Sequence, residues 1–279
     1  MDNRALVLEG GGMRGVFTAG VLDYFLDHNI EFPYVVGVSA GCGNAFSFLS
    51  RQRGRSLYIH TTLLDDYRYI GLKSFVKTGE FIDMNLLYNK LPDEIYPFDI
   101  ESFAANKTHL ESVATNALTG EPCYMGRPND IEELKLICRA SGSLPFLNRV
   151  VEFNGVPMVD GGVADSIPLE RALSRGYERA LVISTQCRGF RKRVSRRSIP
   201  KWAYPKYPKV VEKLNGRAEY YNSQMERVEE LERSGQVDVI RPQAPLVVGR
   251  LTTNTKLLKE LYDEGYASGK EWVEQNLKC

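Results

Sequence analysis

Short, wholly apolar runs alternate along this chain with longer stretches in which apolar residues recur at helical spacing. The runs at residues 5–8, 34–38 and 180–184 are rich in Val, Leu and Ala and predict buried strands. Residues 16–28 repeat apolar positions every three or four residues, which predicts an amphipathic helix. Strands that alternate with helices in this way favour a mostly parallel sheet covered on both faces.

The rest of the chain continues this alternation. Further helices are expected over residues 40–51, 57–69, 84–91, 131–139, 169–175, 210–233 and 255–276, and further strands over 109–116, 122–125 and 237–240. Residues 149–153 and 156–159 predict a hairpin that turns at Asn154-Gly155. The fold class that these elements predict is α/β, in three α/β/α layers around a mostly parallel central sheet.

The composition is that of an ordinary globular protein with a sizeable core, since 43% of the 279 residues are hydrophobic and 25% are charged. The net charge of +1 predicts no broad affinity for nucleic acid. No apolar run reaches the length of about 18 residues that a transmembrane helix needs. Only four residues precede the first predicted strand, which leaves no room for a secretory signal, so we expect a cytoplasmic protein.

The cysteines are odd in number and widely spaced, at Cys42, Cys123, Cys138, Cys187 and Cys279. No C-x-x-C pair occurs, so neither a zinc site nor a disulfide framework is expected, and reduced thiols fit a cytoplasmic protein. Cys42 is expected to be a small buried thiol that packs behind the turn before it. We expect no metal and no cofactor.

A serine stands where the second predicted strand passes into a helix. Ser39 lies at the centre of G-x-S-x-G, with Gly37 two residues before it and Gly41 two residues after it. A sharp strand-to-helix turn would expose the hydroxyl at the edge of the sheet, and the glycines would let neighbouring backbone pass without Cβ clashes. This pattern makes Ser39 a candidate nucleophile.

A glycine-rich loop follows the first predicted strand and opens a helix. It comprises Gly10, Gly11, Gly12, Met13, Arg14 and Gly15, and it formally contains G-x-G-x-x-G. Backbone N–H groups that converge in such a loop suit the pyrophosphate of a dinucleotide or the oxyanion of an acyl-transfer intermediate. A dinucleotide site needs an acidic residue at the end of the second strand, and Glu31 precedes that strand. We therefore favour an oxyanion hole, with nucleotide binding as the alternative.

The base that activates the serine is expected to be a carboxylate. The chain has three histidines: His28 at the end of a helix, His60 within a helical stretch and His109 at the start of a strand, all pointing to surface or edge positions. Asp160 directly follows the apolar strand at 156–159 and precedes Gly161 and Gly162. A carboxylate within hydrogen-bond reach of a serine hydroxyl can orient it and accept its proton.

These three motifs together resemble the patatin-like phospholipase family, in which they appear as G-G-G-x-R-G, G-x-S-x-G and D-G-[GA]. Their order and spacing match, and residues 139–146 resemble a further family segment that ends in proline shortly before D-G-[GA]. The resemblance runs from about residue 5 to 185. Glu9 departs from it, because many members carry Asp at that position, and we expect little consequence.

The resemblance implies a serine–aspartate dyad with Ser39 as nucleophile and Asp160 as base. Backbone N–H groups around Gly11, Gly12 and Met13 would form the oxyanion hole, with Arg14 beside it. The implied activity is that of a serine esterase acting on lipids, a phospholipase A or lysophospholipase. A thioesterase or transacylase with the same dyad is the alternative, because sequence does not determine the leaving group.

The chain is expected to divide into a catalytic core at residues 1–185 and a remainder, 186–279, that completes the same domain with a basic segment and a helical region. From Arg188 to Arg217 there are eleven Lys or Arg and one acid, Glu212, interleaved with aromatic residues. Such a segment could make peripheral contact with an anionic membrane. The alternative is a solvated loop that its prolines keep extended.

Overall fold

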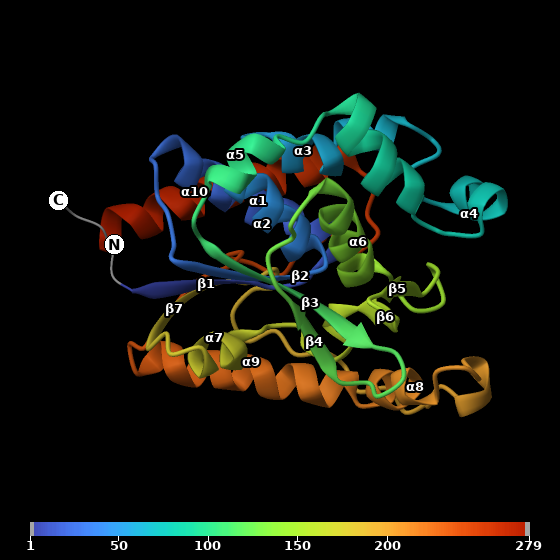
Figure 1. The fold of residues 1–279 in the computed structure, drawn as a ribbon. Helices are drawn as coiled ribbons and strands as arrows, with labels where there is room; N and C mark the ends of the chain where they lie inside the picture. The colour runs from blue at the N-terminus through green and yellow to red at the C-terminus, as the bar shows by residue number, and fades with distance from the viewer. Residues whose placement is uncertain (1–2, 277–279) are drawn as a thin grey trace.

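An eight-stranded sheet forms the middle layer of the molecule (Figure 1), in a computed structural model that describes residues 3–276. The strands are β1 (Arg4–Leu8), β2 (Tyr34–Val38), β3 (His109–Asn116), β4 (Pro122–Met125), β5 (Val151–Phe153), β6 (Val156–Asp160), β7 (Arg179–Ile183) and β8 (Val237–Ile240). Their order is β5-β6-β3-β2-β1-β7-β8, with β4 also paired to β3. The neighbouring strands in the series β3-β2-β1-β7-β8 all pair in parallel, which confirms a mostly parallel sheet. The pairs β3–β4, β3–β6 and β5–β6 are antiparallel.

Helices cover both faces of this sheet. They are α1 (Gly15–Asp27), α2 (Ala40–Leu49), α3 (Arg55–His60), α4 (Leu72–Thr78), α5 (Ile100–Ala105), α6 (Ile131–Gly142), α7 (Leu169–Ser174), α8 (Pro208–Asn215), α9 (Arg217–Arg233) and α10 (Thr255–Asn276). Figure 1 shows α1, α2, α6 and α10 on one face and α7 and α9 on the other. The three-layer α/β/α architecture is thereby confirmed.

The wholly apolar strands are explained by two cores, one on each face of the sheet. Successive side chains of a strand point to opposite faces. In β1, Leu6 and Leu8 belong to the core beneath α1 and α2, whereas Ala5 and Val7 belong to the core beneath α7 and α9. All four are fully buried, so these four positions do not tolerate a polar residue.

The last part of the chain is packed into the same layers. Strand β8 extends the sheet beside β7, and α10 lies along α1. The two helices approach closely at glycines: a Cβ at Gly20 would lie 2.1 Å from the Tyr262 carbonyl oxygen, and one at Gly265 would lie 2.1 Å from the Phe17 carbonyl oxygen. We therefore propose that residues 186–279 complete the domain that residues 1–185 begin.

Several predicted helices have other bounds in the structure. The expected helix over 210–233 breaks at Gly216 into α8 and α9, since glycine is a poor residue for a helix interior. The expected helix over 57–69 ends at His60, where Thr61 leaves helical geometry with φ −128° and ψ −76°. Helices α4 and α5 were not predicted, because six or seven residues are too few to show periodicity.

Five further helical segments, which are not α-helices, lie within residues 3–276: Gly12–Arg14, Thr62–Asp65, Leu86–Ile95, Gly161–Val163 and Lys201–Ala203. The third of them was expected over 84–91; it begins two residues later and continues past Pro92. No helix within residues 3–276 is both long enough and apolar enough to cross a membrane.

Candidate active site

Ser39 occupies a strained turn between β2 and α2. Its backbone angles are φ +54° and ψ −117°, a region that residues with a side chain rarely adopt. The flanking glycines are required by close backbone contacts, because a Cβ at Gly37 would lie 2.6 Å from the Gly41 carbonyl oxygen and one at Gly41 would lie 2.6 Å from the Leu8 carbonyl oxygen. The turn therefore has the geometry of a nucleophile elbow.

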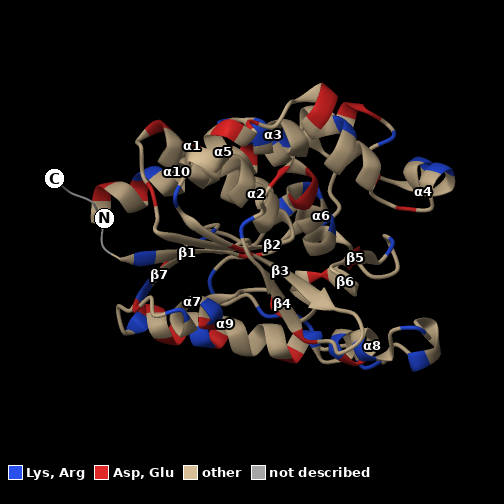
Figure 2. Ribbon diagram, in the orientation of Figure 1, with Lys and Arg blue, Asp and Glu red and all other residues tan. Residues whose placement is uncertain are grey.

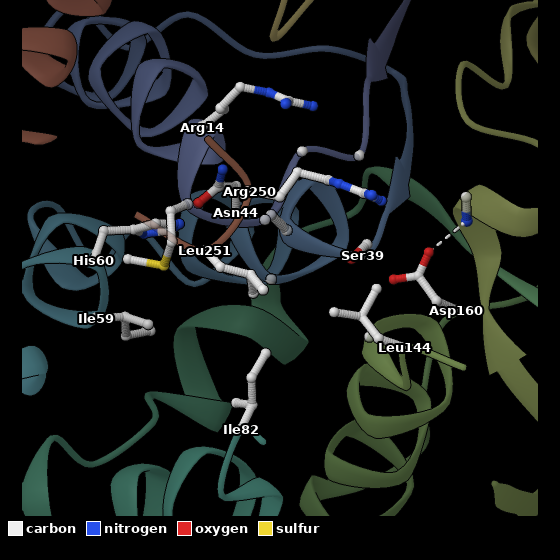
Figure 3. A pocket seen from close by; sticks show the side chains of 18 of the residues that line it. Arg14, Ser39, Asn44, Ile59, His60, Ile82, Leu144, Asp160, Arg250 and Leu251 are labelled. Carbon is white, nitrogen blue, oxygen red and sulfur yellow. Dashed lines mark hydrogen bonds between the residues drawn. The ribbon is translucent and has the colours of Figure 1, made fainter. Parts of the chain in front are cut away.

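The register of the sheet brings Asp160 to the same place. Val38, at the end of β2, pairs with Val113 of β3, and Asp160, at the end of β6, pairs with Ala114 on the other side of β3. Ser39 and Asp160 are thus two strand spacings apart, which is about 10 Å between their backbones. Their side chains face each other across that gap (Figure 3).

The carboxylate of Asp160 is buried, and only one of its two oxygens has a hydrogen-bond partner among the described residues. The side chain is 3% exposed, and its Oδ1 accepts a hydrogen bond of 2.8 Å from the Gly162 N–H. Its Oδ2 is buried and has no hydrogen-bond partner within the described part of the chain. Leaving such an oxygen unpaired is costly, which suggests that it is kept for a partner in the pocket.

The end of α6 fixes both members of this pair. The Ser39 N–H donates to Ser141 Oγ at 2.9 Å, and Ser141 Oγ donates to the Val113 carbonyl at 2.6 Å. Two residues further on, the Ser143 carbonyl accepts a hydrogen bond of 2.7 Å from the Asp160 N–H. This contact gives a physical role to the segment at 139–146, although sequence reasoning did not single out Ser141.

The glycine loop lies beside Ser39 with two unused donors. The Met13 N–H donates to the Arg250 carbonyl oxygen at 3.0 Å, and the Gly10 N–H donates to the Ser166 carbonyl oxygen at 3.3 Å. The N–H groups of Gly11 and Gly12 have no hydrogen-bond partner among residues 3–276. Of the three donors expected from the sequence, Gly11 and Gly12 are therefore available for an oxyanion, whereas Met13 is occupied.

Glu9 anchors this loop to the opposite helical layer. Its Oε2 accepts hydrogen bonds of 2.6 Å from both Ser184 Oγ and the Thr185 N–H, and its Oε1 accepts one of 2.7 Å from the Tyr221 hydroxyl. Because Tyr221 belongs to α9, the C-terminal region helps to position the glycine loop.

His60 does not lie at the surface, and the sequence expectation for this residue was wrong. It is 7% exposed, its Nδ1 lies 2.7 Å from the Ser56 carbonyl oxygen, and the backbone of Gly12 lies near enough to the ring to influence its pKa. Burial lowers its pKa. The helical spacing of Ser56 and His60 was the available signal, because residues four apart share a face. Figure 3 places His60 on the far side of the pocket from Ser39 and Asp160.

The pocket that contains these groups has a charged end and an apolar end. Its basic side chains are Arg14, Lys192, Arg217 and Arg250, and its apolar wall includes Met13, Ile59, Tyr69, Ile70, Ile82, Leu87, Tyr88, Leu144 and Leu251. Two of the cations, Lys192 and Arg217, belong to the basic segment, which the sequence analysis placed against a membrane or in solvent. Lys192 and Arg217 reach the pocket because the segment packs against the rest of the domain, and the local sequence does not predict this packing.

Two further expectations concern cysteine and metal. Cys42 is fully buried behind the elbow, where its thiol lies 3.3 Å from Ser112 Oγ, as expected. Within residues 3–276, no group of three or more His, Cys, Asp or Glu side chains is arranged to hold a metal ion.

Comparison with known proteins identifies the family. Residues 6–173 match the family described as patatin-like phospholipase, so the chain belongs to that family. Residues 207–279 match a domain of unknown function, DUF6363. The uncharacterized protein YjjU of Escherichia coli K12 is 32% identical over 186 residues, which are 65% of this chain and 51% of that protein. This chain therefore matches about half the length of that curated relative.

A solved structure shares the fold. The crystal structure of VipD from Legionella pneumophila superposes with a TM-score of 0.50 at 12% sequence identity, covering 99% of this chain and 67% of that one. At this identity the likeness concerns the fold alone.

Proposed function

We propose that this protein is a serine acyl hydrolase of lipid esters, of phospholipase A or lysophospholipase type, with Ser39 as nucleophile and Asp160 as base. The observation that carries the proposal is the pocket itself, in which this pair lies between an apolar wall and a cationic end. Such a pocket fits an amphiphile whose acyl chain lies along the apolar wall and whose ester carbonyl reaches Ser39. Membership of the patatin-like phospholipase family supports a lipid substrate.

The proposed reaction has two steps. Asp160 Oδ2 accepts the hydroxyl proton while Ser39 Oγ attacks the ester carbonyl carbon, and the N–H groups of Gly11 and Gly12 stabilise the oxyanion. As the tetrahedral intermediate collapses, the C–O bond to the alcohol breaks and Asp160 returns the proton to the leaving oxygen. Water, deprotonated by the same carboxylate, then attacks the acyl-serine, which releases the fatty acid and restores the hydroxyl.

The alternatives differ in what the structure offers them. A thioesterase or transacylase would use the same groups with another leaving group or acceptor, so substrate assays separate them from an ester hydrolase. A dinucleotide-binding protein would need an acidic side chain at the end of β2, where Ser39 stands in a strained conformation instead. Strain of this kind is typical of a reacting residue and favours the hydrolase.

A fluorophosphonate probe tests the assignment of the nucleophile. The wild-type protein is expected to be labelled covalently, and Ser39→Ala is expected to lose the label completely, because no other hydroxyl lies between a base and free amide donors in this pocket. The measurement is in-gel fluorescence with the labelled peptide located by mass spectrometry. Ser47→Ala, in the helix that follows Ser39 but outside this pocket, is the matched control and should be labelled like the wild type. Labelling that persists in Ser39→Ala rules out the proposed nucleophile.

We also propose peripheral contact with anionic membranes through residues 188–217. Figure 2 shows basic residues around α8, and the segment exposes Trp202 to 79% and Val194 to 48% beside the exposed Arg193, Arg196 and Arg197. Basic residues near an anionic surface contribute about 1 kcal/mol each, and exposed apolar side chains add to this.

Reversing the charge of these three arginines tests the membrane contact. The variant with all three replaced by Glu is expected to bind vesicles containing phosphatidylserine at least about 100-fold more weakly, from roughly 1 kcal/mol per residue. The assay is co-sedimentation with vesicles, with pure phosphatidylcholine vesicles as the reference. Arg233→Glu, Lys256→Glu and Lys270→Glu combined, at three exposed positions outside the segment, control for net charge. Equal binding of the two variants to the anionic vesicles would rule out a specific membrane contact through residues 188–217.

A further inference from the structure

The cationic end of the pocket is built from parts of the chain that are far apart in sequence. Arg14 belongs to the glycine loop, Lys192 and Arg217 come from the basic segment, and Arg250 precedes α10. Arg14, Lys192 and Arg217 are half-buried, and Arg250 is exposed. Figure 3 shows Arg14 and Arg250 extending toward the side of the pocket that holds Ser39 and Asp160.

These cations are not neutralised by the protein. The pocket contains four basic side chains and two carboxylates, Glu9 and Asp160. None of the four basic groups forms a salt bridge with a carboxylate in the part of the chain that the structure describes. Charges that are partly withdrawn from water are normally paired, so a surplus of two basic groups over carboxylates calls for an anion from outside.

The contacts of Lys192 and Arg217 place this surplus next to the reacting groups. Arg217 Nε donates to the Gly162 carbonyl oxygen. A Cβ added at Gly162 would lie 3.0 Å from both Arg217 Nη2 and Asp160 Oδ1, so the guanidinium and the carboxylate lie on the same side of this glycine. Lys192 Nζ stands 3.4 Å above the centre of the Tyr221 ring, whose hydroxyl is bonded to Glu9. Burial and the nearby Arg217 lower the pKa of Lys192 to about 6, so this amine is largely neutral at pH 7 before any ligand binds, and a bound anion would favour its protonated form.

We propose that Arg14, Lys192, Arg217 and Arg250 form a phosphate-binding subsite, and that the preferred substrate is a single-chain acyl glycerol ester with a phosphate close to the scissile bond. Guanidinium groups match the geometry of phosphate oxygens, and a phosphate monoester carries about −1.5 to −2 charges at neutral pH, which balances the surplus. In an acyl glycerophosphate only the glycerol carbons separate the ester from the phosphate, so both fit one pocket. This inference deepens the proposed function, on which it rests.

The test compares two substrates that differ only in the phosphate. With 1-decanoyl-glycerol 3-phosphate and 1-decanoyl-glycerol, both supplied as monomers, the wild type is expected to show a kcat/KM about 100-fold higher for the phosphate ester. Removing two cations in Lys192→Met/Arg250→Met is expected to reduce that ratio at least about tenfold, since hydrogen bonds to charged groups contribute strongly. Methionine keeps most of the length of the lysine side chain without its charge. A ratio near one in the wild type overturns the proposal.

A matched control and a binding assay separate the possible failures. Arg233→Met/Lys256→Met removes two exposed charges from the same C-terminal region and should keep the wild-type ratio, while thermal melting checks that each variant is folded. Calorimetric titration of Ser39→Ala with both esters measures binding without turnover. If the wild type hydrolyses neither ester but Ser39→Ala binds the phosphate ester more tightly, the hydrolase assignment fails and the subsite stands.

A free anion is the remaining source of phosphate, and inhibition distinguishes it. Inorganic phosphate is expected to inhibit hydrolysis of 1-decanoyl-glycerol 3-phosphate competitively, because both occupy the same cations. The contrary result is that inorganic phosphate inhibits hydrolysis of both esters equally, with equal kcat/KM for the two. That result would mean that the pocket binds a free anion and does not recognise the phosphate of the substrate. That combination overturns the proposal.

Discussion

Asp160→Asn is expected to lower kcat for ester hydrolysis by about 10³-fold while leaving the fold intact. A general base contributes roughly 10² to 10⁴ to the rate, and in a dyad no second side chain replaces it. Asparagine has the same shape, and its Oδ1 can still accept the hydrogen bond from the Gly162 N–H. What it loses is the proton-accepting oxygen that faces Ser39, so the loss should appear in kcat rather than in KM.

His60 provides the sharpest comparison for this prediction. It is the histidine within this pocket, but it lies across from Ser39 and near the backbone of Gly12 in the glycine loop. His60→Gln can keep one hydrogen bond and is expected to cost about tenfold or less, the value of a single such bond. Steady-state kinetics with a soluble ester measures both variants. A larger loss in His60→Gln than in Asp160→Asn would identify a histidine base and contradict the dyad.

Gly265→Ala is expected to destabilise the protein by about 2 kcal/mol, although alanine is the better helix former. Replacing glycine within a helix gains about 1 kcal/mol in propensity, whereas overpacking costs up to about 3 kcal/mol. The clash should prevail here, because the new Cβ would lie 2.1 Å from the Phe17 carbonyl oxygen and backbone cannot rotate away. The expected fall in Tm is about 4 to 8 °C, measured by calorimetry or circular dichroism.

Gly43→Ala serves as the control for helix propensity. Gly43 lies inside α2, and a Cβ there would meet nothing within 4 Å, so its substitution should be neutral or stabilising by up to about 1 kcal/mol. If Gly265→Ala raises Tm by as much as Gly43→Ala, then α10 is not held tightly against α1, and the C-terminal region does not complete the domain as we propose.

The fold was predictable where local pattern and tertiary environment agree. Strands β1, β2 and β7 are buried on both faces, so their apolar runs are unambiguous. Prediction failed where a helix ends for a local reason within a continuous amphipathic pattern, as at Gly216 and Thr61. Short helices such as α4 contain too few turns to produce a period.

The candidate site was predictable only where a motif and a strand end coincide. Ser39 directly follows β2 and Asp160 is the last residue of β6, so their placement at the edge of the sheet follows from the strands alone. Ser141 and Arg250 act through contacts between segments distant in sequence, and nothing near them along the chain indicates their partners. The sequence likewise did not show that Lys192 turns inward while Arg193, the next residue, stays in solvent.

The hydrogen bond from the Met13 N–H to the Arg250 carbonyl oxygen has a consequence for the timing of synthesis. The glycine loop is synthesised early, but Arg250, whose backbone accepts this hydrogen bond, leaves the ribosome more than two hundred residues later. A nascent chain that already contains Ser39 and Asp160 therefore lacks one of the backbone contacts that hold this loop. If the protein is the acyl hydrolase that we propose, its pocket stays incomplete during translation, when an open pocket could act on any nearby lipid.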